Sequence, residues 1–190
     1  MAAKQPAYQQ REALIRAGFE LAEKPLAAHL TAQALARHAG LPTRSLTQQF
    51  GDLDRFAETL QDLHYAEIRR HTLGAMNGLD PGIDRILRGT QAYFDYAFTR
   101  RGLRSWLSEL RMRSTTMQSQ WRVDNQLYVQ FLATELALIG WPHPLVGARL
   151  FIAAVVELTR HEQQDGRWLP AARRALEGFL RTHEHAAGFV

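Results

Sequence analysis

The spacing of apolar residues constrains the fold of this 190-residue chain more than any other feature. Almost every long window places apolar residues three or four positions apart, which is the repeat of a helix with one buried face. Runs in which apolar and polar residues alternate, as they do in a half-buried strand, are absent from the sequence. We therefore expect an all-α fold.

Capping residues and turn clusters divide this pattern into about nine helices. Thr31 and Asp52 have side-chain oxygens that can cap the free amides at a helix start, and Gly40 accepts the left-handed backbone angles that end a helix. Gly102 and the polar stretch 114–116 are expected to interrupt the helices on either side of them. The expected ranges are 8–23, 31–40, 42–49, 52 to about 71, 83–100, 103–113, 119–139, 144–164 and 170–185.

The composition is that of an ordinary soluble globular chain, with 46% hydrophobic and 22% charged residues. No segment approaches the ~20 consecutive apolar residues that span a bilayer, so no membrane role is expected. The absence of cysteine excludes disulfides and thiolate chemistry, and the first residues lack the features of a secretory signal. We expect a cytoplasmic location.

Basic residues are concentrated near the N-terminus. Residues 1–50 contain six Lys or Arg and three acids, whereas residues 51–190 contain seventeen and sixteen. A local positive excess favours contact with nucleic-acid phosphates, although three charges are weak evidence on their own.

The segment from Thr31 to Phe50 has the spacing of a helix-turn-helix. Two helices of about two turns each are joined by a tight connection around Gly40. Leu46 and Phe50 are placed to hold the second helix against the core.

The other side chains of this second helix are hydroxyls, amides and one guanidinium, with no carboxylate, and we expect them to point outward. Such a surface donates to phosphates and to base edges in the major groove without like-charge repulsion. The candidate DNA-contacting residues of this helix are Thr43, Arg44, Ser45, Thr47, Gln48 and Gln49. The alternative for the same segment is a helical hairpin with a solvated polar face.

The stretch from Arg11 to Phe56 resembles the DNA-binding domain of TetR-type transcription regulators. The residues that match the pattern of that family are Arg11, Leu14, Ile15, Thr31, Leu35, Ala36, Ala39, Gly40, Leu41, Leu46, Phe50, Asp54 and Phe56. The resemblance implies a homodimer that binds double-stranded operator DNA. It implies a DNA-binding domain at residues 1–52, with the start of the fourth helix to about 60, and a ligand-binding and dimerisation domain at residues 53–190.

Three positions depart from the family pattern. Pro42 replaces a capping serine, Thr47 replaces a tyrosine, and Leu53 replaces a lysine. The latter two positions commonly touch the DNA backbone in relatives, so we expect the phosphate contacts to be redistributed. The candidates for these contacts are Lys4, Arg11, Thr31, Arg44 and Arg55.

Beyond residue 60 the resemblance is architectural only. It implies a ligand cavity enclosed by helices that carry Phe94, Trp106, Leu107, Leu110, Met117, Trp121, Tyr128 and Phe131. Aromatic and methionine side chains suit a bulky apolar or aromatic small-molecule effector, which the sequence does not identify. The alternative for each of these residues is a place in the packed core. Arg111 or Arg113 is a candidate to meet an acidic group of the ligand, with solvation as the alternative.

The segment 145–158 is apolar on nearly every face, as expected for a helix between its own domain and a partner subunit. The last helix has one apolar stripe, so these two helices are expected to pair with their symmetry mates. The candidate interface residues are Phe151, Ala154, Val155, Leu158, Leu176, Phe179 and Leu180. Burial within one subunit is the alternative.

The sequence contains no glycine-rich phosphate loop, no HExxH zinc motif and no cysteine nucleophile. We therefore expect no enzyme activity, no metal site and no cofactor, and Asp52 and Asp54 suit the positive end of a helix dipole better than catalysis. The expected function is a repressor that leaves a near-palindromic operator when its ligand binds. The alternative is a DNA-binding protein without a small-molecule effector, which acts architecturally or through a protein partner.

Overall fold

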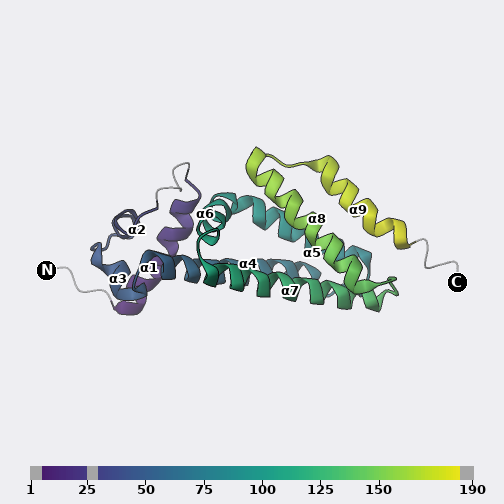
Figure 1. The fold of residues 1–190 in the computed structure, drawn as a ribbon, viewed down its shortest axis with the longest axis horizontal. Coiled ribbons are helices and arrows are strands. Elements are labelled where there is room, and N and C mark those ends of the chain that lie inside the picture. The colour runs from purple at the N-terminus through teal and green to yellow at the C-terminus, as the bar shows by residue number, and fades with distance from the viewer. Residues whose placement is uncertain (1–5, 25–29, 185–190) are drawn as a thin grey trace. The chain divides into compact units, whose positions relative to one another are not determined.

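The computed structural model describes residues 6–24 and 30–184. These residues form nine α-helices and no strand, which confirms the predicted all-α fold (Figure 1). The helices are α1 (Ala7–Ala22), α2 (Ala32–His38), α3 (Arg44–Phe50), α4 (Leu53–Met76), α5 (Ile83–Thr99), α6 (Arg101–Arg111), α7 (Thr115–Leu138), α8 (Pro144–Asp165) and α9 (Pro170–Glu184).

Three predicted helix boundaries are confirmed by their local geometry. The Thr31 hydroxyl accepts a hydrogen bond of 3.1 Å from the Ala34 amide, and the Asp52 carboxylate accepts one of 2.8 Å from the Arg55 amide. Each bond satisfies an amide that the first turn of a helix leaves without a carbonyl partner. Gly40 follows α2 with a φ of +68°, the left-handed conformation that ends many helices.

Two predicted breaks between helices are present but shorter than expected, because α6 begins at Arg101 and α7 at Thr115. α6 begins before Gly102, whose amide donates a hydrogen bond of 3.0 Å to the Glu23 carboxylate. α7 begins directly after Ser114, whose hydroxyl accepts a hydrogen bond of 3.2 Å from the Met117 amide. In both places a side-chain oxygen satisfies a free amide of the first turn, so the helix starts earlier than its composition indicates.

The chain folds as two compact units. The first unit consists of residues 1–66 and 100–119, and the second consists of residues 67–99 and 120–190. Helices α4 and α7 therefore contribute residues to both units. The predicted functional boundary between residues 52 and 53 remains a prediction.

The core of the first unit is formed by α1, α2, α3 and α6 with the first half of α4. Its buried side chains include Leu14, Leu35, Leu46, Phe50, Phe56, Leu60, Leu103, Trp106, Leu107, Leu110 and Met117. Gly18 lets α1 approach α4 closely, because a Cβ atom there would lie 2.7 Å from Leu60 Cδ1 and 2.8 Å from Phe56 Cζ. A larger residue on this face of α1 would push the two helices apart.

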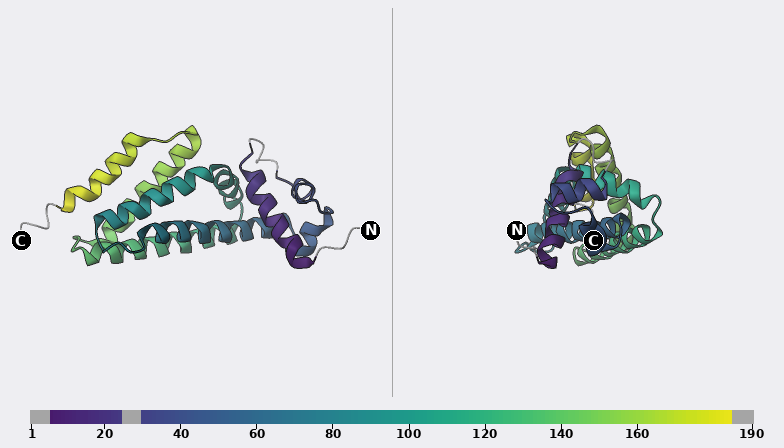
Figure 2. Two further views of the ribbon diagram at one scale, coloured as in Figure 1. Left: turned by 180° about the vertical axis from the view of Figure 1, so that it is seen from behind. Right: turned by 90° about the vertical axis from the view of Figure 1, so that its left-hand side faces the viewer.

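The core of the second unit is formed by α5, α8 and α9 with part of α7, and Figure 2 shows these helices from behind. Arg173 on α9 donates hydrogen bonds to Glu162 on α8 at 2.7 Å and to Asp95 on α5 at 3.3 Å. Its guanidinium carbon lies 4.7 Å from the centroid of the Phe94 ring. One arginine therefore links three helices. No helix of the described ranges has the length and apolar character needed to span a membrane.

Candidate nucleic-acid interface

Helices α2 and α3 form a helix-turn-helix that packs on α1 (Figure 1). The Leu41 amide donates a hydrogen bond of 2.8 Å to the Ala36 carbonyl, and the Gly40 amide donates one of 3.1 Å to the Arg37 carbonyl. These two bonds close a tight turn at the end of α2. Leu46 is 1% exposed and anchors α3 in the core of the first unit.

The face of α3 directed to solvent is polar and carries no carboxylate. The predicted DNA-contacting residues that are exposed are Thr43, Arg44, Thr47 and Gln48, while Gln49 is half-buried. The prediction that Ser45 points outward is wrong, because Ser45 is 3% exposed. The face therefore presents a guanidinium, an amide and two hydroxyl groups to solvent.

The burial of Ser45 follows from the helical repeat. The inward stripe of α3 is formed by Ser45, Leu46, Gln49 and Phe50, at the spacing of i, i+1, i+4 and i+5. A serine is small enough to lie on this stripe beside Leu46. The sequence prediction placed Ser45 on the opposite face because it considered only the polarity of the side chain.

Arg11 on α1 holds the end of α3 in place. Its Nη1 atom donates a hydrogen bond of 3.3 Å to the Gln49 carbonyl, and its guanidinium carbon lies 4.3 Å from the centroid of the Phe50 ring. The Phe50 ring packs edge-on against Phe56 of α4 at 4.9 Å. This guanidinium, a predicted phosphate contact, is thus engaged within the protein, where it holds the end of α3 by a cation–π contact and a charged hydrogen bond.

The other candidates for phosphate contacts lie in different environments. Thr31 is exposed, and its hydroxyl oxygen already accepts from the Ala34 amide, which leaves the hydroxyl proton to donate. Arg55 is exposed on the first turn of α4. Lys4 lies outside the described residues. Leu53 packs against the core of the first unit, so this departure from the predicted pattern adds apolar packing.

The predicted ligand-binding residues are divided between the two cores. Trp106, Leu107, Leu110 and Met117 are buried in the core of the first unit, and Phe94 is buried in that of the second. Three further residues of the second unit are half-buried, namely Trp121, Tyr128 and Phe131. Burial of five side chains fits the packed-core alternative, and ligand contact remains a prediction for all eight.

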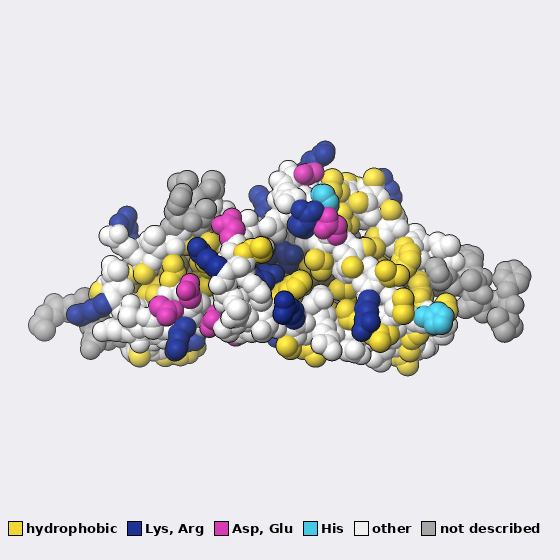
Figure 3. Space-filling model, in the orientation of Figure 1, with side chains coloured by type: hydrophobic (Ala, Val, Ile, Leu, Met, Phe, Trp, Pro, Cys, Tyr) yellow, Lys and Arg dark blue, Asp and Glu magenta, His cyan; other side chains and the backbone are white. Residues whose placement is uncertain are grey.

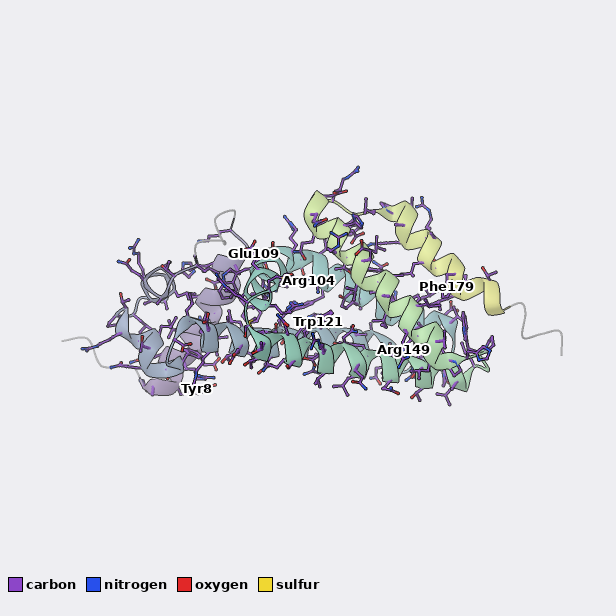
Figure 4. The ribbon with its side chains drawn as sticks, viewed as in Figure 1. Tyr8, Arg104, Glu109, Trp121, Arg149 and Phe179 are labelled. Carbon is purple, nitrogen blue, oxygen red and sulfur yellow. The ribbon has the colours of Figure 1, made fainter. Side chains whose placement is uncertain are left out.

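The predicted dimer residues are mostly interior. The structure buries Phe151, Val155, Leu158 and Leu180 within the second unit itself. Their burial fits the alternative of packing within one subunit, and contact of these four residues with a partner remains a prediction. Leu176 is half-buried, whereas Ala154 and Phe179 are exposed, and Phe179 is labelled in Figure 4.

Several residues of α8 and α9 reach solvent, and the sequence predicted Ala154 and Phe179 among them as interface residues but missed the others. On α8 the exposed residues include Val146 and Leu150, which are 55% and 60% exposed, with Ala153 and Ala154 beside them. On α9 the exposed residues include Ala172, Ala175 and Phe179. Spacings of three and four place each set on one helix face, and Figure 3 shows hydrophobic side chains gathered over this part of the second unit.

No group of three or more His, Asp or Glu side chains suited to a metal ion occurs within the described ranges. No protein-family model matches the sequence, and a search of curated proteins finds no match.

Solved structures match the fold over nearly the whole chain. A transcriptional regulator from Rhodococcus sp. Rha1 aligns over 91% of this chain and 96% of its own, with a TM-score of 0.76 and 16% identity. A Rhodococcus protein described as a TetR-family transcriptional regulator aligns over 92% and 98%, with a TM-score of 0.72 and 16% identity. A protein of Pseudomonas aeruginosa PAO1 described as a transcriptional regulator aligns over 97% and 95%, with a TM-score of 0.73 and 13% identity. The chain therefore has the TetR-like regulator fold that the sequence resemblance predicted.

Proposed function

We propose that this protein is a sequence-specific DNA-binding transcription regulator. The observation that supports it best is the acid-free polar face of α3, presented on a helix-turn-helix whose second helix is fixed by Leu46 and Arg11. A helix of this kind enters the major groove, where rigid placement decides which bases its side chains reach.

Each exposed side chain of this face suits a specific contact. Arg44 can donate two hydrogen bonds to the O6 and N7 atoms of a guanine, and Gln48 can pair with an adenine edge. Thr43 and Thr47, with Thr31 at the start of α2, can donate to phosphates, whereas Gln49 lies half-buried on the inward stripe of α3. Phosphate contacts set affinity and base contacts set specificity. Loss of a threonine that contacts phosphate should therefore weaken binding to all sequences, whereas loss of Arg44 or Gln48 should weaken binding to the operator in particular.

Binding of the purified protein to fragments of its own upstream DNA tests this proposal. The Arg44→Ala variant is compared with Arg37→Ala, because Arg37 is an equally charged, exposed residue that lies on α2 and not on the proposed contact helix. Loss of a base contact costs about 1–3 kcal/mol, so we expect Arg44→Ala to weaken specific binding by roughly 5- to 100-fold. Arg37→Ala is expected to change it by less than about 3-fold.

A salt series and excess competitor DNA separate specific from general electrostatic binding. Saturable binding that survives competition and depends on Arg44 supports the proposal. If both variants lowered affinity equally, or if competitor abolished all binding, the face of α3 would not be a sequence-reading surface.

We propose that the regulator acts as a homodimer through the exposed faces of α8 and α9. Val146 and Leu150 expose apolar side chains on one face of α8, and Ala154 allows close approach of a second helix. Phe179 contributes the largest exposed side chain of α9. Apolar patches of this kind mark interfaces more often than free surface, and two helices from each subunit give a two-fold four-helix contact.

Sedimentation of Leu150→Arg tests the interface against Leu127→Arg as a matched control. Leu150 and Leu127 have almost the same exposure, 60% and 57%, but Leu127 lies on α7. We expect Leu150→Arg to yield monomers and to lose high-affinity operator binding, because two heads are needed to span two half-sites. Leu127→Arg should remain dimeric. Dimers of both variants would refute this interface.

We propose that a small-molecule effector controls operator release. In the unliganded dimer the two α3 helices would lie about one DNA turn apart, ~34 Å, and the ligand would favour a dimer with a different spacing. A ligand can do this only if it binds the two states with different affinity. Calorimetric titration of a compound found by thermal-shift screening, with and without operator, measures that difference, and equal affinities would refute the mechanism.

The alternative is a regulator without a small-molecule effector, which acts architecturally or through a protein partner. The filled cores around Trp106 and Phe94 favour it, because those side chains already pack against protein. A broad screen without any stabilising compound, combined with intact operator binding, would support this alternative.

A further inference from the structure

The turn that joins α4 to α5 contains the only Asn-Gly pair of the sequence, Asn77 and Gly78 (Figure 1). Both residues are exposed, as are Leu79 and Asp80 after them. Because α4 ends at Met76, neither residue of the pair belongs to a helix. The side chain of the asparagine and the backbone after it are therefore open to water.

Few hydrogen bonds hold this turn. The Asn77 amide donates to the Gly74 carbonyl at 3.4 Å and the Leu79 amide to the Met76 carbonyl at 3.3 Å, both longer than the ordinary ~2.9–3.0 Å. The amide between them, that of Gly78, donates no hydrogen bond to the backbone of another described residue. Its nitrogen is therefore not engaged in secondary structure.

Gly78 also leaves space around this nitrogen. Its φ is +76°, a conformation that glycine adopts without strain, and a Cβ atom there would meet nothing within 4 Å beyond its chain neighbours. The carboxamide carbon of Asn77 can close a five-membered ring with the nitrogen of the next residue. An intramolecular reaction of this kind is fast when the two groups can approach freely, as they can in this turn.

We propose that Asn77 is a site of spontaneous deamidation. The Gly78 backbone nitrogen forms a bond to the carboxamide carbon of Asn77, the carboxamide C–N bond breaks, and the proton of the backbone amide leaves with the released nitrogen as ammonia. Water then opens the cyclic imide at either of its two carbonyl carbons. Attack at the side-chain carbonyl gives aspartate, and attack at the main-chain carbonyl gives isoaspartate. Water is the only co-reactant, and no group is oxidised or reduced.

Asn125, the other asparagine of the chain, lies in a different environment. It is half-buried within α7, and the residue that follows it is Gln126. In a helix the amide after an asparagine donates to the carbonyl of the preceding turn, so ring closure would require the helix to open. The chain therefore contains its own control for the reaction.

Deamidation would change both the charge and the length of the turn. Either product places a carboxylate just beyond the C-terminal end of α4, where the helix dipole is negative, and isoaspartate adds one carbon to the main chain. The turn is tied to the second unit, because the Leu79 carbonyl accepts a hydrogen bond of 3.2 Å from Arg85 Nη1. The same arginine pairs at 3.1 Å with Glu135 of α7, which is 4% exposed. We therefore expect the modified chain to be less stable.

Mass spectrometry of the full-length protein after several weeks at physiological temperature tests the site. We expect the intact chain to gain about 1 Da, and peptide fragmentation to locate aspartate and isoaspartate at residue 77. Asn77→Gln keeps a carboxamide but requires a larger ring, so this variant should gain no mass over the same period. Asn125→Gln is the matched control and should gain as much as wild type.

Thermal unfolding measures the effect of the new charge. Asn77→Asp reproduces one of the two products, and its unfolding midpoint should lie about 1–4 °C below that of wild type. An unchanged midpoint would overturn the expected loss of stability.

The peptide map of the wild type does not depend on the folding of any variant. The proposed site is overturned if the incubated chain gains no mass, or if the gain maps to Asn125 or to a glutamine. Aspartate at residue 77 without isoaspartate would also overturn it, because direct hydrolysis gives aspartate alone. The reaction requires neither DNA nor a partner, so a failure of the proposed regulator function would leave this site intact.

Discussion

The contact between α1 and α6 predicts an unusual response to a glycine-to-alanine substitution. A Cβ atom at Gly102 would overlap the Ala22 carbonyl oxygen and would lie 2.8 Å from the Glu23 Cα atom. Both neighbours are backbone atoms, so neither can rotate away. Alanine in a helix normally adds up to about 1 kcal/mol of stability over glycine. Overpacking costs about 1–3 kcal/mol, and displacement of α6 would also weaken the 3.0 Å bond to the Glu23 carboxylate. We expect Gly102→Ala to lower the free energy of unfolding by about 2 kcal/mol.

Denaturant unfolding followed by circular dichroism measures this change, with Gly74→Ala as the matched control. Gly74 is exposed in α4, and a Cβ atom there would meet nothing within 4 Å. The control should therefore gain up to about 1 kcal/mol from helix propensity alone. Opposite signs for the two substitutions are the expected result. Equal stabilisation of both variants would refute the close approach of α6 to the end of α1.

Three further predictions concern charged and titratable groups. Arg11→Ala should lower the free energy of unfolding by about 1–2 kcal/mol, because it removes the cation–π contact with Phe50 and a hydrogen bond. The control Arg16→Ala, on the exposed side of α1, should change this free energy by less than about 0.5 kcal/mol. Arg173→Met should cost about 3–5 kcal/mol by leaving Glu162, which is 1% exposed, as an unpaired buried charge, and adding Glu162→Gln should recover part of the loss. The pKa of His64 is lowered in the folded state, so the unfolded chain takes up the proton first as the pH falls below about 6.5. The free energy of unfolding should therefore drop by up to about 1.4 kcal/mol per pH unit until the pKa of the folded state is reached. Parallel unfolding curves of His64→Gln should lack this part of the pH dependence; an identical dependence in both proteins would contradict the burial of a neutral histidine.

Local signals in the sequence predicted most of the fold. Thr31, Gly40 and Asp52 mark helix ends by chemistry that acts within a few residues, and the structure confirms all three. The misplaced helix starts at Gly102 and Ser114 have different origins. Ser114 caps α7 through the Met117 amide three residues away, so this error lies in reading a local signal as a break. The oxygen that caps α6 comes from Glu23, 79 residues away in the chain, and no local pattern can anticipate it.

The outward residues of α3 and of α8 were harder to predict, for different reasons. Ser45 is polar yet lies on the inward stripe, where its small volume matters more than its hydroxyl. In the segment 145–158 of α8 nearly every residue is apolar, so the sequence cannot separate Val155, which faces its own core, from Leu150, which faces solvent. The distinction depends on where α5 and α9 pack, which is a property of the folded unit.

The candidate ligand contacts could be chosen from the sequence only by the character of their side chains. Arg111 and Arg113 were both candidates to meet an acidic group of the ligand; Arg111 is half-buried and Arg113 is exposed. This difference depends on how α6 packs in the folded unit, which the sequence does not show.

Two arginines close to α3 are expected to act differently, and one pair of assays separates them. Arg44 is exposed on α3, whereas the Arg11 guanidinium donates a hydrogen bond to the Gln49 carbonyl and lies over the Phe50 ring. We expect Arg44→Ala to weaken operator binding by roughly 10-fold or more and to change the free energy of unfolding by less than about 0.5 kcal/mol. Arg11→Ala should lower the free energy of unfolding by about 1–2 kcal/mol. Fluorescence anisotropy with operator DNA and denaturant unfolding measure both quantities on the same preparations. If Arg44→Ala lowered stability as much as Arg11→Ala, its effect on operator binding would not identify the exposed face of α3 as the DNA-binding surface.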